Sequence, residues 1–262
     1  MAAFTVALLG LGEAGSVIAR DLVAAGASVR GFDPAGGADV AGVQRAPDAR
    51  AAVDGSDVVL SVTTASAALA AARDAAGVLR QGQVYADLNA SGAALKRAVA
   101  EVVAPTGAQF ADVAVMGVVP RDGLRTPALV SGPGAKAFAA HLGALGMPVE
   151  VLSDEPGAAA ARKLLRSVFM KGLAAACLES VRAARAAGCE DWMRLEIEGV
   201  LAAADAALLE RLVSGSARHA TRRIGEVADA RELLAELGVE PRVTMAAGGW
   251  LAQLERESEA AT

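Results

Sequence analysis

Three glycines near the N-terminus have the spacing with which a backbone binds phosphate groups. Gly10, Gly12 and Gly15 follow the pattern G-x-G-x-x-G, between an apolar run and a helical pattern. In dinucleotide-binding units the first glycine permits a tight turn, the second lets the backbone approach a pyrophosphate, and the third allows close helix–strand packing. The N–H groups at the start of that helix favour phosphate. We therefore interpret Gly10, Gly12, Glu13, Ala14 and Gly15 as cofactor-binding residues.

An acidic residue follows at the distance expected for a ribose ligand. Asp33 ends a second strand pattern, residues 28–32, and lies 18 residues after Gly15. A carboxylate at this position binds the adenosine ribose hydroxyls and repels a 2′-phosphate, so Asp33 favours NAD over NADP. The alternative is a glycine turn in an unrelated α/β sheet, with Asp33 as a turn former before Pro34.

Two of the chain's four lysines lie close together in a helical segment that follows the strand patterns. On a helical wheel Lys163, Arg166, Ser167 and Lys171 gather on one side, and apolar residues fill the remaining arc. A lysine in a partly desolvated cleft near other cations has a lowered pKa, so it can act as a base at neutral pH and as an acid in the reverse reaction. Lys163 is our candidate for that group. The alternative is a solvated helix face.

Polar residues also follow two of the predicted strands. Thr63 and Thr64 come after residues 57–62, and Asn89 follows residues 84–87. Ligands of open α/β sheets bind at the carboxyl ends of the strands, so these side chains are candidates for contact with a cofactor. Their alternative role is to cap the helices that follow them.

Strand and helix patterns alternate as far as residue 153, which predicts an α/β Rossmann domain with a doubly wound, mostly parallel sheet over residues 1–153. Strand patterns disappear from Pro156 onward. We expect an all-helical substrate and dimerisation domain over residues 154–262, with helices at about 157–187, 191–212, 216–237 and 241–257.

Composition excludes several classes of protein. A net charge of −5 argues against nucleic-acid binding. Two cysteines and two histidines are too few and too scattered for a metal site, and no apolar run is long enough to predict a membrane span. The N-terminus lacks the basic region of a signal peptide, so we expect a cytoplasmic protein.

Five segments, spread over nearly the whole chain, resemble those of one enzyme superfamily. They are GLGEAG at 10–15, DLNASGAALK at 87–96, DVAVMG at 112–117, RKLLRSVFMKG at 162–172 and RHATRRIGEV at 218–227. On these segments the chain resembles the β-hydroxyacid dehydrogenases, which include 3-hydroxyisobutyrate and 6-phosphogluconate dehydrogenases. It looks closest to the branch with a phosphogluconate-dehydrogenase-like C-terminal domain of unknown function.

The resemblance implies roles for individual residues. The lysine that matches Lys163 is the general acid/base, and the segment with Met116 and Gly117 shapes the substrate site. Members form an interlocked homodimer through their C-terminal helices, in which Arg222 and Arg223 are candidates for binding a carboxylate or phosphate. Their alternative role is surface solvation or pairing with Glu226.

One departure from the superfamily concerns the catalytic helix. Many members have asparagine where this chain has Ser167, which can still donate one hydrogen bond. We expect an NAD-dependent oxidoreductase for a small hydroxy acid, in which Lys163 moves the proton while Ser167 and Lys171 orient the substrate. An imine reductase and a non-catalytic NAD-binding protein are the alternatives.

Overall fold

The chain divides into two compact units in a computed structural model that describes residues 4–260. The units are Met1–Ser167 and Val168–Thr262. The division falls inside one long helix, whereas the last strand ends at Ser153. The domain limits at residue 153 remain a proposal from the sequence.

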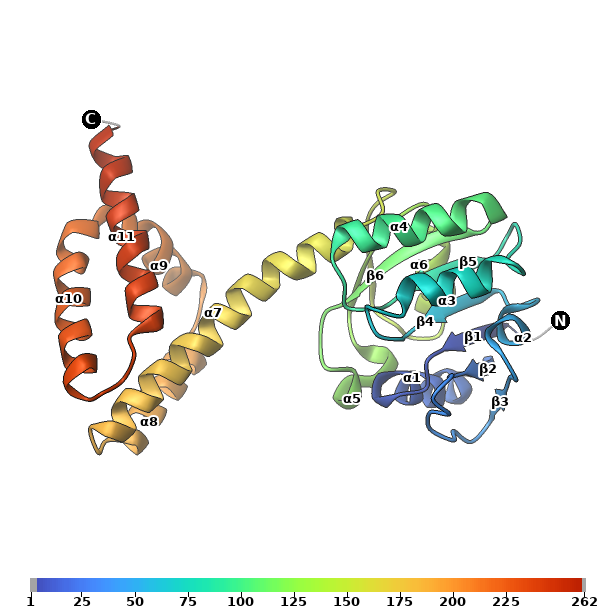
Figure 1. The fold of residues 1–262 in the computed structure, drawn as a ribbon, viewed down its shortest axis with the longest axis horizontal. Coiled ribbons are helices and arrows are strands. Elements are labelled where there is room, and N and C mark those ends of the chain that lie inside the picture. The colour runs from blue at the N-terminus through green and yellow to red at the C-terminus, as the bar shows by residue number, and fades with distance from the viewer. Residues whose placement is uncertain (1–3, 261–262) are drawn as a thin grey trace. The chain divides into compact units, whose positions relative to one another are not determined.

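The first unit is built on one sheet of eight strands in the order β3-β2-β1-β4-β5-β6-β7-β8 (Figure 1). The strands are β1 (Thr5–Leu9), β2 (Ser28–Phe32), β3 (Val43–Arg45), β4 (Val58–Ser61), β5 (Val84–Asp87), β6 (Gln109–Val115), β7 (Ala128–Ser131) and β8 (Val149–Ser153). Neighbouring strands are parallel except β6 and β7, which pair antiparallel. The order β3-β2-β1-β4-β5-β6 is that of a Rossmann fold, so the predicted doubly wound, mostly parallel sheet is confirmed.

Sequence reasoning did not find β3. This edge strand has only three residues, directly after a loop rich in glycine and alanine, so it offers too short a pattern to recognise.

Helices cover both faces of the sheet. They are α1 (Glu13–Ala24), α2 (Ala49–Val53), α3 (Ala68–Ala76), α4 (Ala93–Val103), α5 (Val119–Asp122) and α6 (Ala135–Ala144), with the short 3-10 turns η1 (Ala104–Thr106) and η2 (Gly123–Arg125). Because successive strand residues point to opposite faces, β1 contributes to two cores. Val6 and Leu8 pack with α1 and α6, whereas Ala7 and Leu9 pack with α2, α3 and α4.

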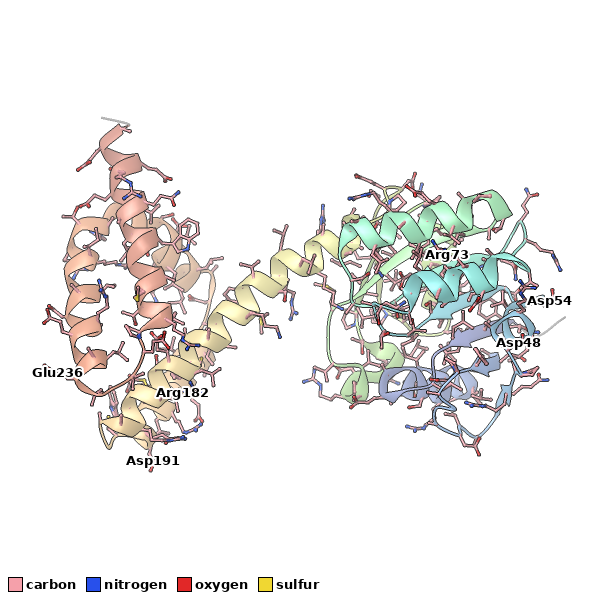
Figure 2. The ribbon with its side chains drawn as sticks, in the orientation of Figure 1. Asp48, Asp54, Arg73, Arg182, Asp191 and Glu236 are labelled. Atoms are coloured by element: carbon pink, nitrogen blue, oxygen red, sulfur yellow. The ribbon has the colours of Figure 1, made fainter. Side chains whose placement is uncertain are left out.

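The second unit is all helical, as predicted. It contains most of α7 (Ala158–Ala186), then α8 (Glu190–Ala202), α9 (Ala206–Arg218), α10 (Ala220–Glu236) and α11 (Arg242–Ala260). Exposed charged residues such as Arg182, Asp191 and Glu236 project from these helices (Figure 2).

Two helix limits were predicted wrongly. Residues 191–212 form two helices, because Asp205 starts α9 by accepting a hydrogen bond from the Leu208 N–H at 2.8 Å. The next break lies at His219, so residues 216–218 belong to α9 and α10 begins at Ala220.

The helices of the second unit bury few large side chains. Among its described residues the buried apolar ones are Ala184, Ala220, Leu234 and Leu251. By contrast Phe169 on α7 is 62% exposed and Trp250 on α11 is 65% exposed. Over residues 4–260, no helix has the length and apolar character needed to span a membrane.

Candidate cofactor and active site

The loop between β1 and α1 has the geometry of a phosphate-binding turn. Gly10 has φ +101°, and a Cβ there would lie 2.2 Å from the carbonyl oxygen of Val62. A Cβ at Gly15 would lie 2.1 Å from the carbonyl oxygen of Gly10, so both positions exclude any side chain. A Cβ at Gly12 would meet no atom of the described chain within 4 Å. The loop is thus closed on its protein side and open in front of Gly12, where a pyrophosphate fits.

The start of α1 is available to an anion. Gly12 is the N-cap residue, and within residues 4–260 no side chain caps this turn. The first helical residues, Glu13 and Ala14, follow directly, with their backbone N–H groups at the positive end of the helix dipole. This arrangement fits the role predicted for the cofactor phosphates.

Asp33 holds the glycine loop in place. Its Oδ2 accepts a hydrogen bond from the Leu11 N–H at 2.7 Å, and its Oδ1 accepts one from the Ala35 N–H at 2.9 Å. It is therefore the turn former that the sequence left as an alternative. A carboxylate has about four lone-pair sites, so these two bonds leave capacity for ribose hydroxyls.

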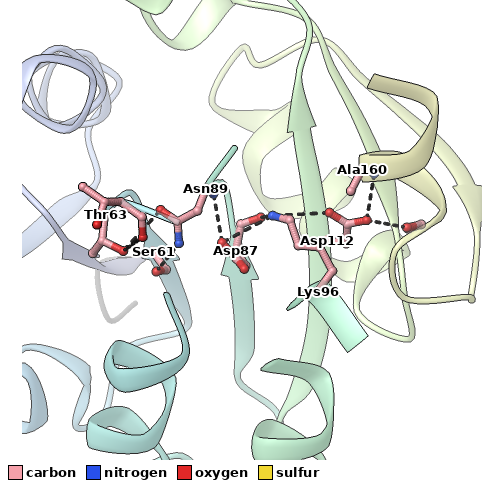
Figure 3. A network of polar contacts seen from close by, with 9 residues as sticks. Ser61, Thr63, Asp87, Asn89, Lys96, Asp112 and Ala160 are labelled. Atoms are coloured by element: carbon pink, nitrogen blue, oxygen red, sulfur yellow. Dashed lines mark hydrogen bonds and ion pairs between the residues drawn. The ribbon is translucent and has the colours of Figure 1, made fainter. Parts of the chain in front are cut away.

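Side chains at the ends of β4 and β5 form one polar network (Figure 3). The Thr63 hydroxyl donates to Asn89 Oδ1 at 3.3 Å, and Asn89 Nδ2 donates to Ser61 Oγ at 3.0 Å. The Asn89 N–H donates to Asp87 Oδ1 at 2.9 Å. Thr63 and Asn89 thus lie together at the edge where cofactors of such sheets bind.

Thr64 joins this network only through its backbone carbonyl oxygen, which lies 3.2 Å from the Thr63 hydroxyl, whereas its own hydroxyl contacts that of Ser66 at 3.0 Å. The following helix, α3, has Ala67 as its N-cap, and no side chain of the described residues caps it. The predicted alternative role of Thr63 and Thr64 as caps is therefore wrong for α3.

Lys96, which sequence reasoning did not select as a site residue, continues the network from β5 to β6 (Figure 3). Its Nζ lies 2.7 Å from the carbonyl oxygen of Asp87, 3.3 Å from Asp87 Oδ1 and 3.4 Å from Asp112 Oδ1. Lys96 is 1% exposed and both carboxylates are fully buried. Burial raises the pKa of Asp87, and the Lys96 ammonium partly opposes that shift.

A signal for Lys96 was present in the sequence. It shares the buried face of α4 with Val99 and Val103, at the spacing of an apolar helix stripe. A lysine in such a stripe needs a buried partner, and acidic residues end or occupy the strands beside it.

Asp112 also binds the start of α7. Its Oδ2 accepts hydrogen bonds from the Ala160 N–H at 3.0 Å and from the Ser131 hydroxyl at 3.2 Å. Ser131 Oγ in turn accepts one from the Ala159 N–H at 3.0 Å. Two side chains of β6 and β7 therefore cap the first turn of the helix that carries Lys163.

Lys163 lies on the following turn of α7 and is half-buried. Burial lowers the pKa of Lys163, the nearby charges of Lys96 and Arg166 lower it further, and Asp112 opposes them. A lysine of this kind can exchange a proton nearer neutral pH than an exposed lysine can. Ser167 is half-buried one turn further along the same helix.

The remaining predicted substrate residues lie on two different parts of the chain. Met116 and Gly117 follow β6, and the Met116 N–H donates to the carbonyl oxygen of Pro127 at 2.7 Å. Lys171 lies on α7 in the second unit and is exposed. The role of these three residues toward a substrate remains a prediction.

Arg222 and Arg223 lie on α10, in the second unit. Arg222 Nη1 pairs with Glu226 Oε1 at 2.8 Å, which is the alternative role named for it, and Arg223 donates to the Ser216 hydroxyl. Both arginines line an open groove of about 790 Å³ together with Trp250.

Two family models match the chain. Residues 5–146 match the NAD binding domain of 6-phosphogluconate dehydrogenase, and residues 184–254 match a domain of unknown function, DUF1932.

Solved structures resemble the chain over nearly its whole length. A conserved hypothetical protein from Sinorhizobium meliloti 1021 is 30% identical, with a TM-score of 0.62 over 95% of this chain and 87% of that one. A conserved protein of unknown function, described as similar to 3-hydroxyacid dehydrogenases, is 27% identical, with a TM-score of 0.62 over 96% and 97%. An imine reductase from Myxococcus stipitatus in complex with NADP+ is 21% identical, with a TM-score of 0.82 over 97% and 94%, a likeness of fold.

Proposed function

Because the chain belongs to the family that carries the NAD binding domain of 6-phosphogluconate dehydrogenase, we propose that it is an NAD(P)-dependent oxidoreductase acting on a small hydroxy acid or its oxo form. The observation that carries this proposal is the position of Lys163. It is half-buried beside other cations, on a helix whose first turn is capped by the strands of the cofactor-binding unit.

The cofactor-binding residues between β1 and α1 have two different roles. Gly10, Gly12 and Gly15 let the pyrophosphate approach the backbone, and the N–H groups of Glu13 and Ala14 receive its charge. A bound nicotinamide cofactor supplies hydride transfer.

Side chains further along the sheet edge complete that site. Asp33 accepts hydrogen bonds from the ribose in this proposal, with the lone pairs that its two backbone hydrogen bonds leave free. Thr63 and Asn89, and Thr64 beside them, border the cofactor where β4 and β5 end.

Lys163 accepts and donates the proton of the reaction. In the oxidation direction its neutral amine takes the proton from the substrate hydroxyl, and in reduction its ammonium returns one. Ser167 donates a hydrogen bond that orients the substrate, while Met116 and Gly117 shape the pocket. Lys171, Arg222 and Arg223 provide cations for an acidic substrate.

The choice between NAD and NADP is open in this proposal. The ranking of NADP below NAD, drawn from Asp33, does not stand, because the Myxococcus stipitatus protein of the same fold is in complex with NADP+. Asp33 already makes two backbone hydrogen bonds that shape the loop, so its presence alone does not exclude a 2′-phosphate.

Imine reduction is the second candidate function, and the fold shared with an imine reductase favours it. An ammonium at Lys163 could supply the proton that this reduction also requires. A non-catalytic role as a nucleotide-binding protein is the third possibility, and it predicts cofactor binding without turnover.

We further propose a homodimer formed through the second unit. Each of its helices leaves large apolar side chains more than half exposed, among them Val168, Phe169, Leu195, Val213, Leu233 and Trp250. Apolar surface on this scale is typical of a face that another chain covers. A small anionic substrate is the other expected partner, and a cytoplasmic location remains a prediction of the sequence.

The test follows nicotinamide absorbance with purified protein. The panel holds 2-hydroxy, 3-hydroxy and sugar acids, their oxo forms and cyclic imines, each with NAD(H) and NADP(H). Turnover of a hydroxy acid that is lost in Lys163→Ala supports the proposal. Turnover of imines alone favours the second candidate, and cofactor binding without any turnover favours the third.

A further inference from the structure

Lys96 occupies a position that links the cofactor edge to the proposed catalytic helix. On one side its ammonium contacts Asp87, which accepts the N–H of Asn89. On the other side it contacts Asp112, which binds the first turn of α7 (Figure 3). Burying an ammonium between two carboxylates costs free energy, because all three charged groups lose their hydration. This cost indicates that Lys96 has a role beyond the stability of the fold.

We propose that Lys96 is a positioning residue for Lys163: its ammonium orients the Asp112 carboxylate toward the start of α7, the helix that carries the Lys163 amine. This inference rests on the proposed role of Lys163 as acid/base. It adds a cause for the lowered pKa of that amine, because the Lys96 ammonium is a positive charge near it in addition to that of Arg166.

The charges that act on Lys163 come from three elements. Lys96 on α4 and Arg166 on α7 disfavour its protonated form, whereas Asp112 on β6 favours it. Asp87 contacts Lys96 from the side opposite Asp112, so we expect its charge to act on Lys163 less than that of Asp112 does. The two carboxylates therefore have separable effects, and this allows a matched control.

Simple removal of Lys96 leaves Asp87 and Asp112 buried without their cation, which can unfold the first unit. The variant to measure is therefore Lys96→Met/Asp87→Asn, which removes one charge of each sign. Asp87→Asn alone is its control. Asp112→Asn is the third protein, since the asparagine oxygen can still accept from the Ala160 N–H.

The readout is the titration of each lysine by NMR, with the side chains labelled with 13C at Cε. The chain has only four lysines, so their signals can be assigned by substitution, and the exposed Lys136 on α6 serves as an internal reference. The measurement uses the full chain without substrate, so it does not depend on finding the reaction.

The expected shifts in the pKa of Lys163 differ in sign between the variants. The pKa of Lys163 rises by about one unit in Lys96→Met/Asp87→Asn, falls in Asp112→Asn, and changes least in Asp87→Asn. If Lys96 served only to hold the fold together, every variant that loosens α7 would shift this pKa upward. An upward shift in Asp112→Asn, or no shift in the double variant, would overturn the inference.

If the double variant does not fold, Lys96→Gln replaces it, because the neutral amide can still donate a hydrogen bond to a buried carboxylate. The pKa of Lys163 should again rise, and an unchanged pKa would overturn the inference. Different experiments would contradict this inference and the proposed function. Full turnover by Lys163→Ala would remove the catalytic role of Lys163, whereas the titration would still show whether Lys96 controls its protonation.

Discussion

Gly10 and Gly12 are two residues apart, yet a methyl group at each would meet different surroundings. Gly10 combines φ +101° with backbone at 2.2 Å from a Cβ, so Gly10→Ala strains the fold by about 1–3 kcal/mol. Gly12→Ala meets open space and leaves the fold unchanged, but its methyl group lies where a pyrophosphate must approach. We expect Gly12→Ala to keep the wild-type Tm and to weaken cofactor binding about tenfold, or roughly 1.4 kcal/mol.

Thermal unfolding measures the effect of each substitution on stability, and calorimetric titration with NAD(H) and NADP(H) measures its effect on cofactor affinity. Unchanged cofactor affinity in Gly12→Ala would show that the cofactor binds elsewhere.

The protonation of Lys163 sets the pH dependence of the reaction. Burial and the charges of Lys96 and Arg166 lower the pKa of Lys163, and the neutral amine is the form that accepts a proton. Oxidation of a hydroxy acid should therefore speed up as pH rises through this lowered pKa and then level off, below the ordinary lysine range. Reduction should slow over the same interval. Profiles of kcat/KM against pH in both directions check this, and two profiles that rise together would contradict it.

At the level of residues, the cofactor loop was predictable because three glycines and one aspartate occur at fixed spacings that geometry requires. The second role of Asp33, which binds the Leu11 N–H, was not predictable because it depends on how the loop folds back. Lys96 was missed for the same reason, since its partners Asp87 and Asp112 lie on different strands.

Among the elements, α11 depends on a carboxylate from α7. Glu179 accepts hydrogen bonds from the Val243 and Thr244 N–H groups at 2.7 and 2.9 Å and from the Thr244 hydroxyl at 2.6 Å. Replacing such a capping group costs about 1 kcal/mol of unfolding free energy, so we expect Glu179→Gln to destabilise the protein by this order.

The effect of Glu179→Gln depends on pH. Burial raises the pKa of Glu179, but the hydrogen bonds from Thr244 and Val243 outweigh burial and leave the pKa lowered. A carboxylate with a lowered pKa stabilises the folded state above its unfolded value, and this contribution is lost as pH falls through the folded value. Urea unfolding should show the full difference from wild type at neutral pH and a smaller one in acid. A difference that grows in acid would refute this assignment.

Hydrophobic periodicity predicted where most helices and strands occur, but it did not predict every helix boundary. The alternation of strands and helices gave the class of the first unit, but the break between α8 and α9 was missed. Residues 191–212 have a continuous helical pattern, and only the side chain of Asp205 marks the new start. An aspartate is common both on exposed helix surfaces and at N-caps, so its role emerges only when its hydrogen bond to Leu208 is seen.

At the scale of the whole molecule, the exposed apolar side chains of the second unit predict a dimer. Val213 is 63% exposed and Trp250 is 65% exposed, and no sequence pattern specifies which face a second copy covers. We expect wild-type protein to sediment as a dimer, and Val213→Glu/Trp250→Glu to shift it toward monomer, because two buried charges would oppose association.

Val151→Glu is the matched control, since Val151 lies on β8 of the first unit and is also exposed. It should leave the dimer intact. A monomeric wild type, or a dimer broken only by the control, would show that the second unit is not the interface.

The central claim is that Lys163 moves the proton, and its most direct test compares wild type with Lys163→Ala on the substrate found in the panel. We predict that kcat/KM falls by about 10²–10⁴-fold while the Kd for the cofactor, measured by calorimetry, stays the same. Lys136→Ala, which removes an exposed lysine on α6, should behave as wild type. Wild-type turnover by Lys163→Ala, with cofactor bound normally, would contradict the account.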